Sequence, residues 1–353
     1  MDMRVDAAPQ APAIRHQLRF EGSGGEYFKI WIVNLALTIV TLGIFSAWAK
    51  VRSKRYFYGN TYIGEHNFDY HGQPLRILLG RVIALALLLA YSATVQFLPK
   101  ATFVWGFAFL FGMPWLVVAG LRFNAKNTSY RNIRFNFTGT YGGAFAAYIL
   151  WAFLAALTLF TTYPLARRAR DQYNINNHSF GGKYFTVEIP GAAMYRIYLM
   201  ALLFFVGFLA VASGIYFGIK TAPLDFHNPI ASAPLFLVFG GAYLFALLFL
   251  TTYVGTSVFN LVLGRTVLAD QFRFEASLSP LHMTWLMFSN LVLTLLTLGL
   301  FYPWAMTRIA QYRADNLVIT GPGEMDGFIS ELVGGQGAIG EEVASFFDVD
   351  LGL

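Results

Sequence analysis

Seven long apolar runs divide the chain, and none of them contains Asp or Glu. A helix needs about 20 apolar residues to cross a hydrocarbon core of about 30 Å. Helices of a soluble core are shorter and carry a polar stripe, which these runs lack. We therefore predict an all-α polytopic membrane protein with about seven hydrophobic segments. The runs cover residues 28–48, 82–98, 102–121, 142–163, 197–219, 235–263 and 283–304.

Parts of this pattern repeat along the chain. A shift of 256 places residues 34–60 on residues 290–316 with 13 identities in 27 positions, where chance gives roughly two or three. A shift of 139 adds the end of the fourth run, through Tyr163, Pro164 and Asn177. The first, fourth and seventh runs then define a 3+3+1 plan. Three crossings per unit would invert successive units, an arrangement typical of transporters.

Each copy continues beyond its apolar run in the same way. A basic and aromatic helical stretch ends at Asn, and a short segment with β-like alternation follows. These segments read NTYIGEHNFDYHG, NTSYRNIRFNFTG and NNHSFGGKYFTVEIPG, and a further copy around Phe272 and Phe274 would follow the sixth run. We predict that each segment forms a small β-hairpin in a loop at the membrane surface.

Charge is distributed unevenly and refines the domain organisation. Charged residues make up 12% of the chain, about half the usual share. Residues 321–353 contain seven acidic and no basic residues. We expect an N-terminal surface segment (1–27), a membrane domain (28–320) and an acidic, Gly-rich tail (321–353). The tail either docks on the basic loops or stays solvated. The basic remainder predicts anionic membrane lipids as partners and no nucleic acid.

The basic residues also test the topology. Seven crossings put 13 Lys and Arg on one face and 12 on the other, against the positive-inside rule. If the first, fourth and seventh runs enter and return, the count becomes 23 against 2, with Lys100 and Lys220 opposite. Thr-Leu-Gly in the first and seventh runs permits such a turn. The run 142–163 shows no central break, so we favour seven crossings.

Two stretches of the sequence resemble a known family. FEGSGGEYFKIWIVNLALTIVTLGIFSAWAKVRSKRYFYGNT and LTLGLFYPWAMTRIAQYRADNL resemble the YjgN-like family of bacterial inner-membrane proteins, a domain of unknown function. The resemblance extends over nearly the whole chain. It implies a multi-pass protein of the bacterial inner (cytoplasmic) membrane, and it implies no substrate and no catalytic residue.

Candidate chemistry is sparse. The chain has no Cys, which excludes disulfides and thiolate chemistry. His66, Asp69 and His71 form the only local cluster that approaches metal-ligand spacing, but the two His face opposite sides of a strand. No catalytic motif is present. The apolar runs contain no carboxylate, which argues against a carrier coupled to protons. We predict no enzyme activity, no metal and no cofactor.

Two sets of residues are candidate sites. The first is a lipid-headgroup or interface site of aromatic and basic residues: Trp48, Arg52, Arg55, Trp304 and Arg308. The second is a polar path of Asn34, Thr38, Asn290 and Thr294. Simple anchoring at the headgroups and hydrogen bonds between helices explain the same residues. We predict an integral inner-membrane protein of unknown function that interacts with lipids or acts as a scaffold. The alternative is a transporter of a small or amphipathic solute.

Overall fold

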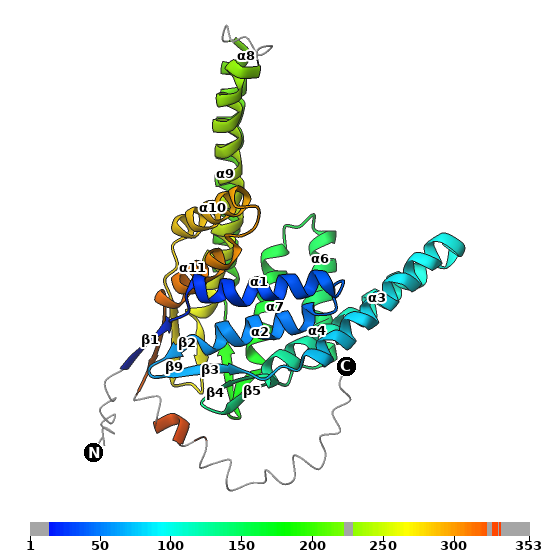
Figure 1. Cartoon of the computed structure of the whole chain (residues 1–353), viewed down its shortest axis with the longest axis vertical. Coiled ribbons are helices and arrows are strands. Elements are labelled where there is room, and N and C mark those ends of the chain that lie inside the picture. The colour runs from blue at the N-terminus through cyan, green and yellow to red at the C-terminus, as the bar shows by residue number, and fades with distance from the viewer. Residues whose placement is uncertain (1–13, 222–228, 323–326, 331, 333–353) are drawn as a thin grey trace, which may run out of the picture.

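A closed β-barrel is the centre of the fold (Figure 1), and it corrects the expectation of an all-α protein. The computed structural model describes residues 14–221, 229–322, 327–330 and 332. Within these residues ten antiparallel strands close in the order β1-β10-β9-β8-β7-β6-β5-β4-β3-β2. The strands are β1 (Ile14–Phe20), β2 (Thr61–Ile63), β3 (His66–Tyr70), β4 (Thr128–Tyr130), β5 (Ile133–Phe137), β6 (His178–Phe180), β7 (Lys183–Val187), β8 (Thr266–Leu268), β9 (Phe272–Ala276) and β10 (Leu317–Gly321).

The predicted hairpins exist, but they are not separate surface elements. Each one pairs with the hairpins of neighbouring copies, as Phe68 does with Tyr130 and Phe135 with Phe180. Closure satisfies the backbone of strands only three to seven residues long, which a lone hairpin in water would hardly keep paired.

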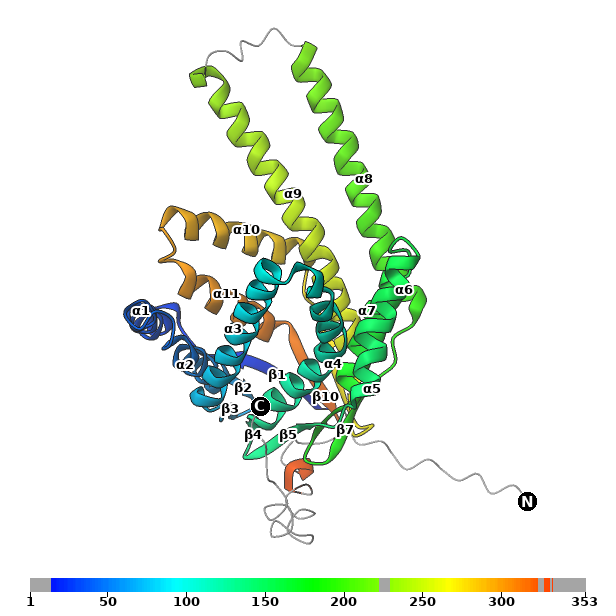
Figure 2. The same cartoon turned by 90° about the vertical axis from the view of Figure 1, so that its right-hand side faces the viewer.

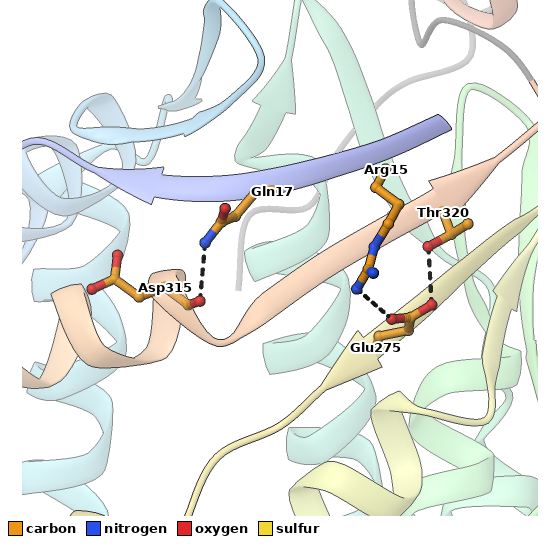
Figure 3. Close-up of polar contacts among 5 residues, drawn as sticks. All are labelled: Arg15, Gln17, Glu275, Asp315 and Thr320. Atoms are coloured by element: carbon orange, nitrogen blue, oxygen red, sulfur yellow. Dashed lines mark hydrogen bonds and ion pairs between the residues drawn. The ribbon is translucent and has the colours of Figure 1, made fainter. Parts of the chain in front are cut away.

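Residues near both ends of the described chain close the barrel. The first strand, β1, pairs with β10 on one side and with β2 on the other. Figure 3 shows the polar contacts at this junction: Glu275 accepts hydrogen bonds from Arg15 at 3.1 Å and from Thr320 at 3.0 Å. The side chain of Gln17 donates to the carbonyl of Asp315 at 3.1 Å. The predicted N-terminal surface segment therefore contributes a strand to the barrel.

Aromatic side chains fill the barrel. Phe68, Phe135, Phe185 and Phe274 occupy the central positions of β3, β5, β7 and β9, and Leu18 packs with them from β1. Ring centroids of successive members lie 6.5, 6.3 and 5.9 Å apart, distances that favour aromatic contact. The repeat thus supplies one large side chain per copy to a common layer.

The start of the acidic tail packs against the same core. Phe328, Ile329 and Leu332 are buried with barrel residues that include Phe272 and Phe180. Phe328 and Phe272 lie 4.8 Å apart between ring centroids. Figure 1 shows this helical turn beside the barrel, away from the long helices. The contact is apolar, in contrast to the expected docking on basic loops. Residues 333–353 lie outside the described residues.

Five helical hairpins connect the strands. Three are short: α1 (Gly24–Val40) with α2 (Ser46–Gly59); α5 (Tyr141–Ala144), a π-helix at Phe145–Leu150 and α6 (Trp151–Leu157) with α7 (Tyr163–Asn176); and α10 (Pro280–Leu296) with α11 (Tyr302–Asp315). Two are long: α3 (Pro74–Phe97), a 3₁₀ turn at Pro99–Ala101 and α4 (Phe103–Lys126); and α8 (Gly191–Thr221) with α9 (Pro229–Leu263). The long pairs project beyond the short ones in Figure 1.

The described residues contain four candidate membrane spans, so the prediction of seven segments is wrong. The spans are Pro74–Phe97, Pro99–Lys126, Gly191–Phe217 and Phe239–Leu263. The other three runs each fold into two helices that begin and end at the barrel. This fold matches the entering-and-returning alternative, and 22 Lys and Arg of the described residues lie on the barrel side of the tips of the two long hairpins.

A threonine stabilises the turn of each short hairpin. The hydroxyl of Thr41 donates to the carbonyl of Leu37 at 2.7 Å and accepts from the amide of Phe45 at 2.9 Å. Thr297 makes the equivalent bonds at 2.7 and 2.9 Å. The carbonyls of Leu37 and Leu293 also accept from the backbone amides of Thr41 and Thr297, so the hydroxyls chiefly satisfy the amides of Phe45 and Phe301, and an unpaired amide in lipid would cost several kcal/mol.

The fourth run contains the same turn, contrary to our reading of it as uninterrupted. The hydroxyl of Thr158 donates to the carbonyl of Leu154 at 2.9 Å. Leu159 and Phe160 have φ values of +50° and +64°, where the first run has Leu42 and Gly43 at +49° and +93°. Left-handed conformations are uncommon for residues other than glycine. For this reason Thr-Leu-Gly in the first run predicted a turn, and Thr158-Leu159-Phe160 in the fourth run did not.

Five copies of one unit make the ring. Each unit is a helix, a β-hairpin and a second helix, and the fifth joins α11 and β10 to β1 and α1. In four units the helix ends at an Asn whose amide donates to the carbonyl four residues earlier, at 2.7 to 2.8 Å. The four are Asn60, Asn127, Asn177 and Asn316. The four β-hairpins and the β1/β10 pair belong to one barrel, so the copies share one orientation, and the 3+3+1 plan of inverted units is wrong.

Candidate membrane interface site

Two buried asparagines each accept a hydrogen bond from an arginine across a short hairpin. Nη1 of Arg52 lies 3.0 Å from Oδ1 of Asn34, and Nη1 of Arg308 lies 2.6 Å from Oδ1 of Asn290. The two amides are 4% and 5% exposed. Charged donors strengthen such bonds, particularly where water is excluded. The structure thus joins residues that we had assigned to two separate sites, since each arginine holds one member of the polar path.

The two threonines of the predicted path lie in different surroundings. The hydroxyl of Thr38 donates to the carbonyl of Asn34 at 2.6 Å, within its own helix. Thr294 lines a cavity of about 510 Å³ between α1, α2, α3 and the last short hairpin. Lys50 and Arg81 line the same cavity.

The two tryptophans of the predicted interface site pack against neighbouring rings. Trp48 stacks on Phe45, 6.0 Å away between ring centroids. Trp304 lies 5.2 Å from Phe28, and a Cβ at Gly24 would stand 2.2 Å from the Trp304 ring. The glycine therefore lets α11 approach α1, so Trp304 helps to close the ring of helical hairpins.

Arg55 has a structural partner. Its Nε donates to the carbonyl of Tyr70 at 3.3 Å, at the end of β3. Arg122 makes the equivalent bond to Phe137 at 3.4 Å in the next unit. In both units this bond joins the helix to the end of the second strand of the β-hairpin that follows it.

The tips of the short hairpins are exposed and apolar. Leu42, Leu159 and Leu298 are 95%, 85% and 94% exposed. Exposed leucine at every tip would be unfavourable in water and is favourable in a hydrocarbon layer. Arg55, Arg170 and Arg313 lie near the barrel ends of these hairpins, and Lys50 of α2 lies nearer its tip. Each short hairpin therefore has a basic end at the barrel and an apolar tip.

A large basic cavity was missed by the sequence reasoning. It lies between α2, α3 and α4, has a volume of about 860 Å³, and is lined by Lys50, Arg76, Arg122, Lys126 and Arg134 among others. One feature of the sequence could have indicated this cavity: cations flank the second and third apolar runs, with Arg76 before the second run and Lys126 after the third. The cavity lies outside the repeated motifs from which the candidate sites were predicted.

The histidine cluster does not come together. Among the described residues no group of three His, Asp or Glu side chains is arranged to hold a metal ion. Nε2 of His71 lies 2.8 Å from the hydroxyl of Ser129.

Burial lowers the pKa of His178, and a hydrogen bond from its Nδ1 to the carbonyl of Asn174 at 2.6 Å acts in the opposite direction.

These features define a class of protein: a multi-pass membrane protein in which a five-unit ring of helical hairpins stands on a small β-barrel. The chain belongs to the family of bacterial proteins of unknown function DUF898, whose model matches residues 15–346. The resemblance to the YjgN-like family is therefore confirmed.

Known relatives establish the location. The inner membrane protein YjgN of Salmonella typhimurium strain LT2 is 26% identical, over 87% of this chain and 89% of its own length. YjgN of Escherichia coli strain K12 is 24% identical over the same shares. The protein is a multi-pass protein of the bacterial inner membrane. No solved structure matches the chain.

Proposed function

We propose that this protein interacts with the lipids of one leaflet of the inner membrane and acts there as a scaffold, without enzyme activity. The observation that carries this proposal is the polarity of the three short hairpins. Each presents an exposed leucine at its tip and returns to a basic base at the barrel. Such hairpins enter the bilayer from one side, and cations at their base attract anionic headgroups.

The charge distribution supports one orientation of the protein in the membrane. Among the described residues, 22 Lys and Arg lie on the barrel side, and Lys100 and Lys220 lie at the far ends of the two long hairpins. Because cytoplasmic segments are enriched in Lys and Arg, we place the barrel in the cytoplasm. The lipids that meet the hairpins are then those of the cytoplasmic leaflet, where anionic lipids attract basic segments.

The transporter alternative loses its main support. It relied on inverted repeats, and the five copies share one orientation around the barrel. In the predicted path, Oδ1 of Asn34 and Oδ1 of Asn290 accept hydrogen bonds from Arg52 and Arg308, and Nδ2 of Asn290 donates to the carbonyl of Ala305.

The test is the thermal stability of the purified protein in a neutral detergent, measured against anionic lipids, neutral lipids and a panel of small metabolites. We expect anionic phosphatidylglycerol to raise Tm by several degrees and neutral phosphatidylcholine to raise it much less. Stabilisation by a soluble metabolite, without an effect of lipid, would contradict the proposal and favour transport.

A further inference from the structure

The cavity between α2, α3 and α4 combines a volume of about 860 Å³ with five cationic side chains in its lining. We propose that it binds one anionic phospholipid, with the phosphate among the basic side chains and an acyl chain between α3 and α4. This inference deepens the proposed function and rests on it, because it gives the lipid interaction a defined site. Its volume of about 860 Å³ lies within the range of small-molecule sites, about 300 to 1,000 Å³.

Polarity changes along the cavity in the order that a phospholipid requires. Arg76 lies in the first turn of α3 and Lys126 at the end of α4, both next to the barrel. Farther from the barrel the lining includes Trp115 and Leu116 of α4, and the cation Lys50 of α2 lies on the opposite side of the cavity. A soluble phosphate would use only the basic end, whereas a phospholipid uses both ends.

The basic end is suited to an anion. None of the side chains that line the cavity in the described part of the chain is acidic. The bond from Arg122 to the carbonyl of Phe137 uses Nε, one of the five N–H groups of a guanidinium. Arginine and lysine together provide the charge-assisted hydrogen bonds that recognise phosphate oxygens.

The shape of the α3/α4 hairpin leaves space for an acyl chain. Tyr91 and Trp105 are in contact near the tip, with ring centroids 5.9 Å apart. Toward the barrel the two helices part, and Figure 2 shows them as an inverted V. Gly80 and Gly120 line the opening, and a Cβ on either would meet nothing within 4 Å. By contrast, the short hairpins are joined across their helices, for example by the pair Asn34 and Arg52.

The experiment compares two variants that change net charge equally. The cavity variant carries the substitutions Lys50→Gln, Lys126→Gln and Arg134→Gln. The matched control carries Lys183→Gln, Arg273→Gln and Arg313→Gln, which replace three exposed cations that do not line the cavity. Each full-length protein is purified in a neutral detergent, and Tm is measured during titration with phosphatidylglycerol, phosphatidylcholine, inorganic phosphate or glycerol phosphate.

We expect phosphatidylglycerol to stabilise the wild type and the control alike, and the cavity variant to need about tenfold more lipid for the same shift, as for the loss of about 1.4 kcal/mol. If the cavity variant does not fold, Gly120→Leu gives a second test. It fills the acyl-chain space without changing charge, and we expect the same loss of lipid response.

The other outcomes separate the two proposals. Equal stabilisation of wild type, control and both cavity variants would overturn this site and leave the lipid interaction intact. No stabilisation of any protein by lipid would overturn both. Stabilisation by inorganic phosphate or glycerol phosphate as strong as by lipid would assign the cavity to a soluble phosphate. A lipid response seen only after removal of residues 333–353 would assign it to the acidic tail in the intact chain.

Discussion

Nη1 of Arg308 lies 2.6 Å from Oδ1 of Asn290, eighteen residues earlier in the chain, and Arg52 makes the same bond to Asn34. The short hairpin formed by α5, α6 and α7 has Trp151 and Ala169 at the corresponding positions. In that hairpin a large ring and a small side chain replace the polar pair.

The polar pair should be energetically coupled. We expect Asn290→Ala and Arg308→Ala each to lower the stability of the protein by about 1–3 kcal/mol, because each leaves a polar partner unpaired. The double variant should lose less than the sum, with a coupling of about 0.5–3 kcal/mol. Denaturation in detergent measures this, and Lys183→Ala, an exposed cation on β7, serves as the control. Additive effects would show that the two residues act independently.

The threonine at the hairpin turn should matter more than other membrane threonines. Thr297→Val removes the bonds to the carbonyl of Leu293 and from the amide of Phe301, in a turn exposed to lipid. We expect a loss of about 1–3 kcal/mol, because a backbone group is left unpaired. Thr251→Val on α9 is the matched control, since that hydroxyl bonds only to carbonyls within its own helix. Equal loss in both variants would argue against a special role for the turn.

Part of this architecture could be predicted from sequence. The repeat correctly located four helix ends at Asn and the β-hairpins after them, because Asn caps and alternating aromatics act locally. The barrel could not be predicted in the same way. Its strands pair across units, as β1 does with β10, and strands of three residues have no periodicity to detect.

The error at the fourth run has a different origin. We required glycine for a turn, whereas Thr158 holds its own turn with Leu159 and Phe160 in left-handed conformations. Extending the alignment at the shift of 139 pairs Thr158 with Thr297, and this match alone would have predicted the break. The basic cavity escaped detection because it depends on how far α3 and α4 diverge, which no local pattern encodes.

Removal of the C-terminal helical turn should destabilise the barrel. Phe328 is buried against Phe272, 4.8 Å away between ring centroids. We expect Phe328→Ala to cost about 3–5 kcal/mol, as for a large ring removed from a core. Phe328→Leu retains most of the apolar area and should cost much less. Deletion of residues 322–353 should lower Tm at least as much as Phe328→Ala. An unchanged Tm after deletion would contradict the packing of the tail against the barrel.

His178 should make stability depend on pH. Its folded pKa lies below the ordinary value because of burial, so the unfolded chain binds the proton more tightly. The stability is fully present above about pH 6.5, the unfolded pKa, and declines as pH falls from there toward the folded pKa.

Three other units test this assignment within the same protein. Thr61, Thr128 and Thr266 stand where His178 does and donate to the carbonyl four residues earlier, at 2.8 to 2.9 Å. His178→Thr should therefore keep the hydrogen bond and reduce the loss of Tm between pH 7.5 and pH 5.5. An identical loss in variant and wild type would assign the pH dependence to other groups.

The membrane topology can be tested by cysteine labelling, because the natural chain has no cysteine. Glu65→Cys and Thr186→Cys place thiols on two barrel hairpins, and Lys100→Cys places one at the tip of the α3/α4 hairpin. A membrane-impermeant maleimide should label the first two only when the cytoplasmic face is accessible. It should label Lys100→Cys from the opposite face.

The same experiment separates the short hairpins from complete spans. With seven crossings, positions 65 and 186 would lie on opposite faces, because the fourth run would cross between them. One barrel requires both on one face. Leu298→Cys, at a tip that is 94% exposed in the isolated protein, should react from neither face in membranes and should become reactive in detergent. Labelling of Leu298→Cys from the periplasm would show that this hairpin crosses the membrane, and labelling from the cytoplasm would show that it does not enter the bilayer.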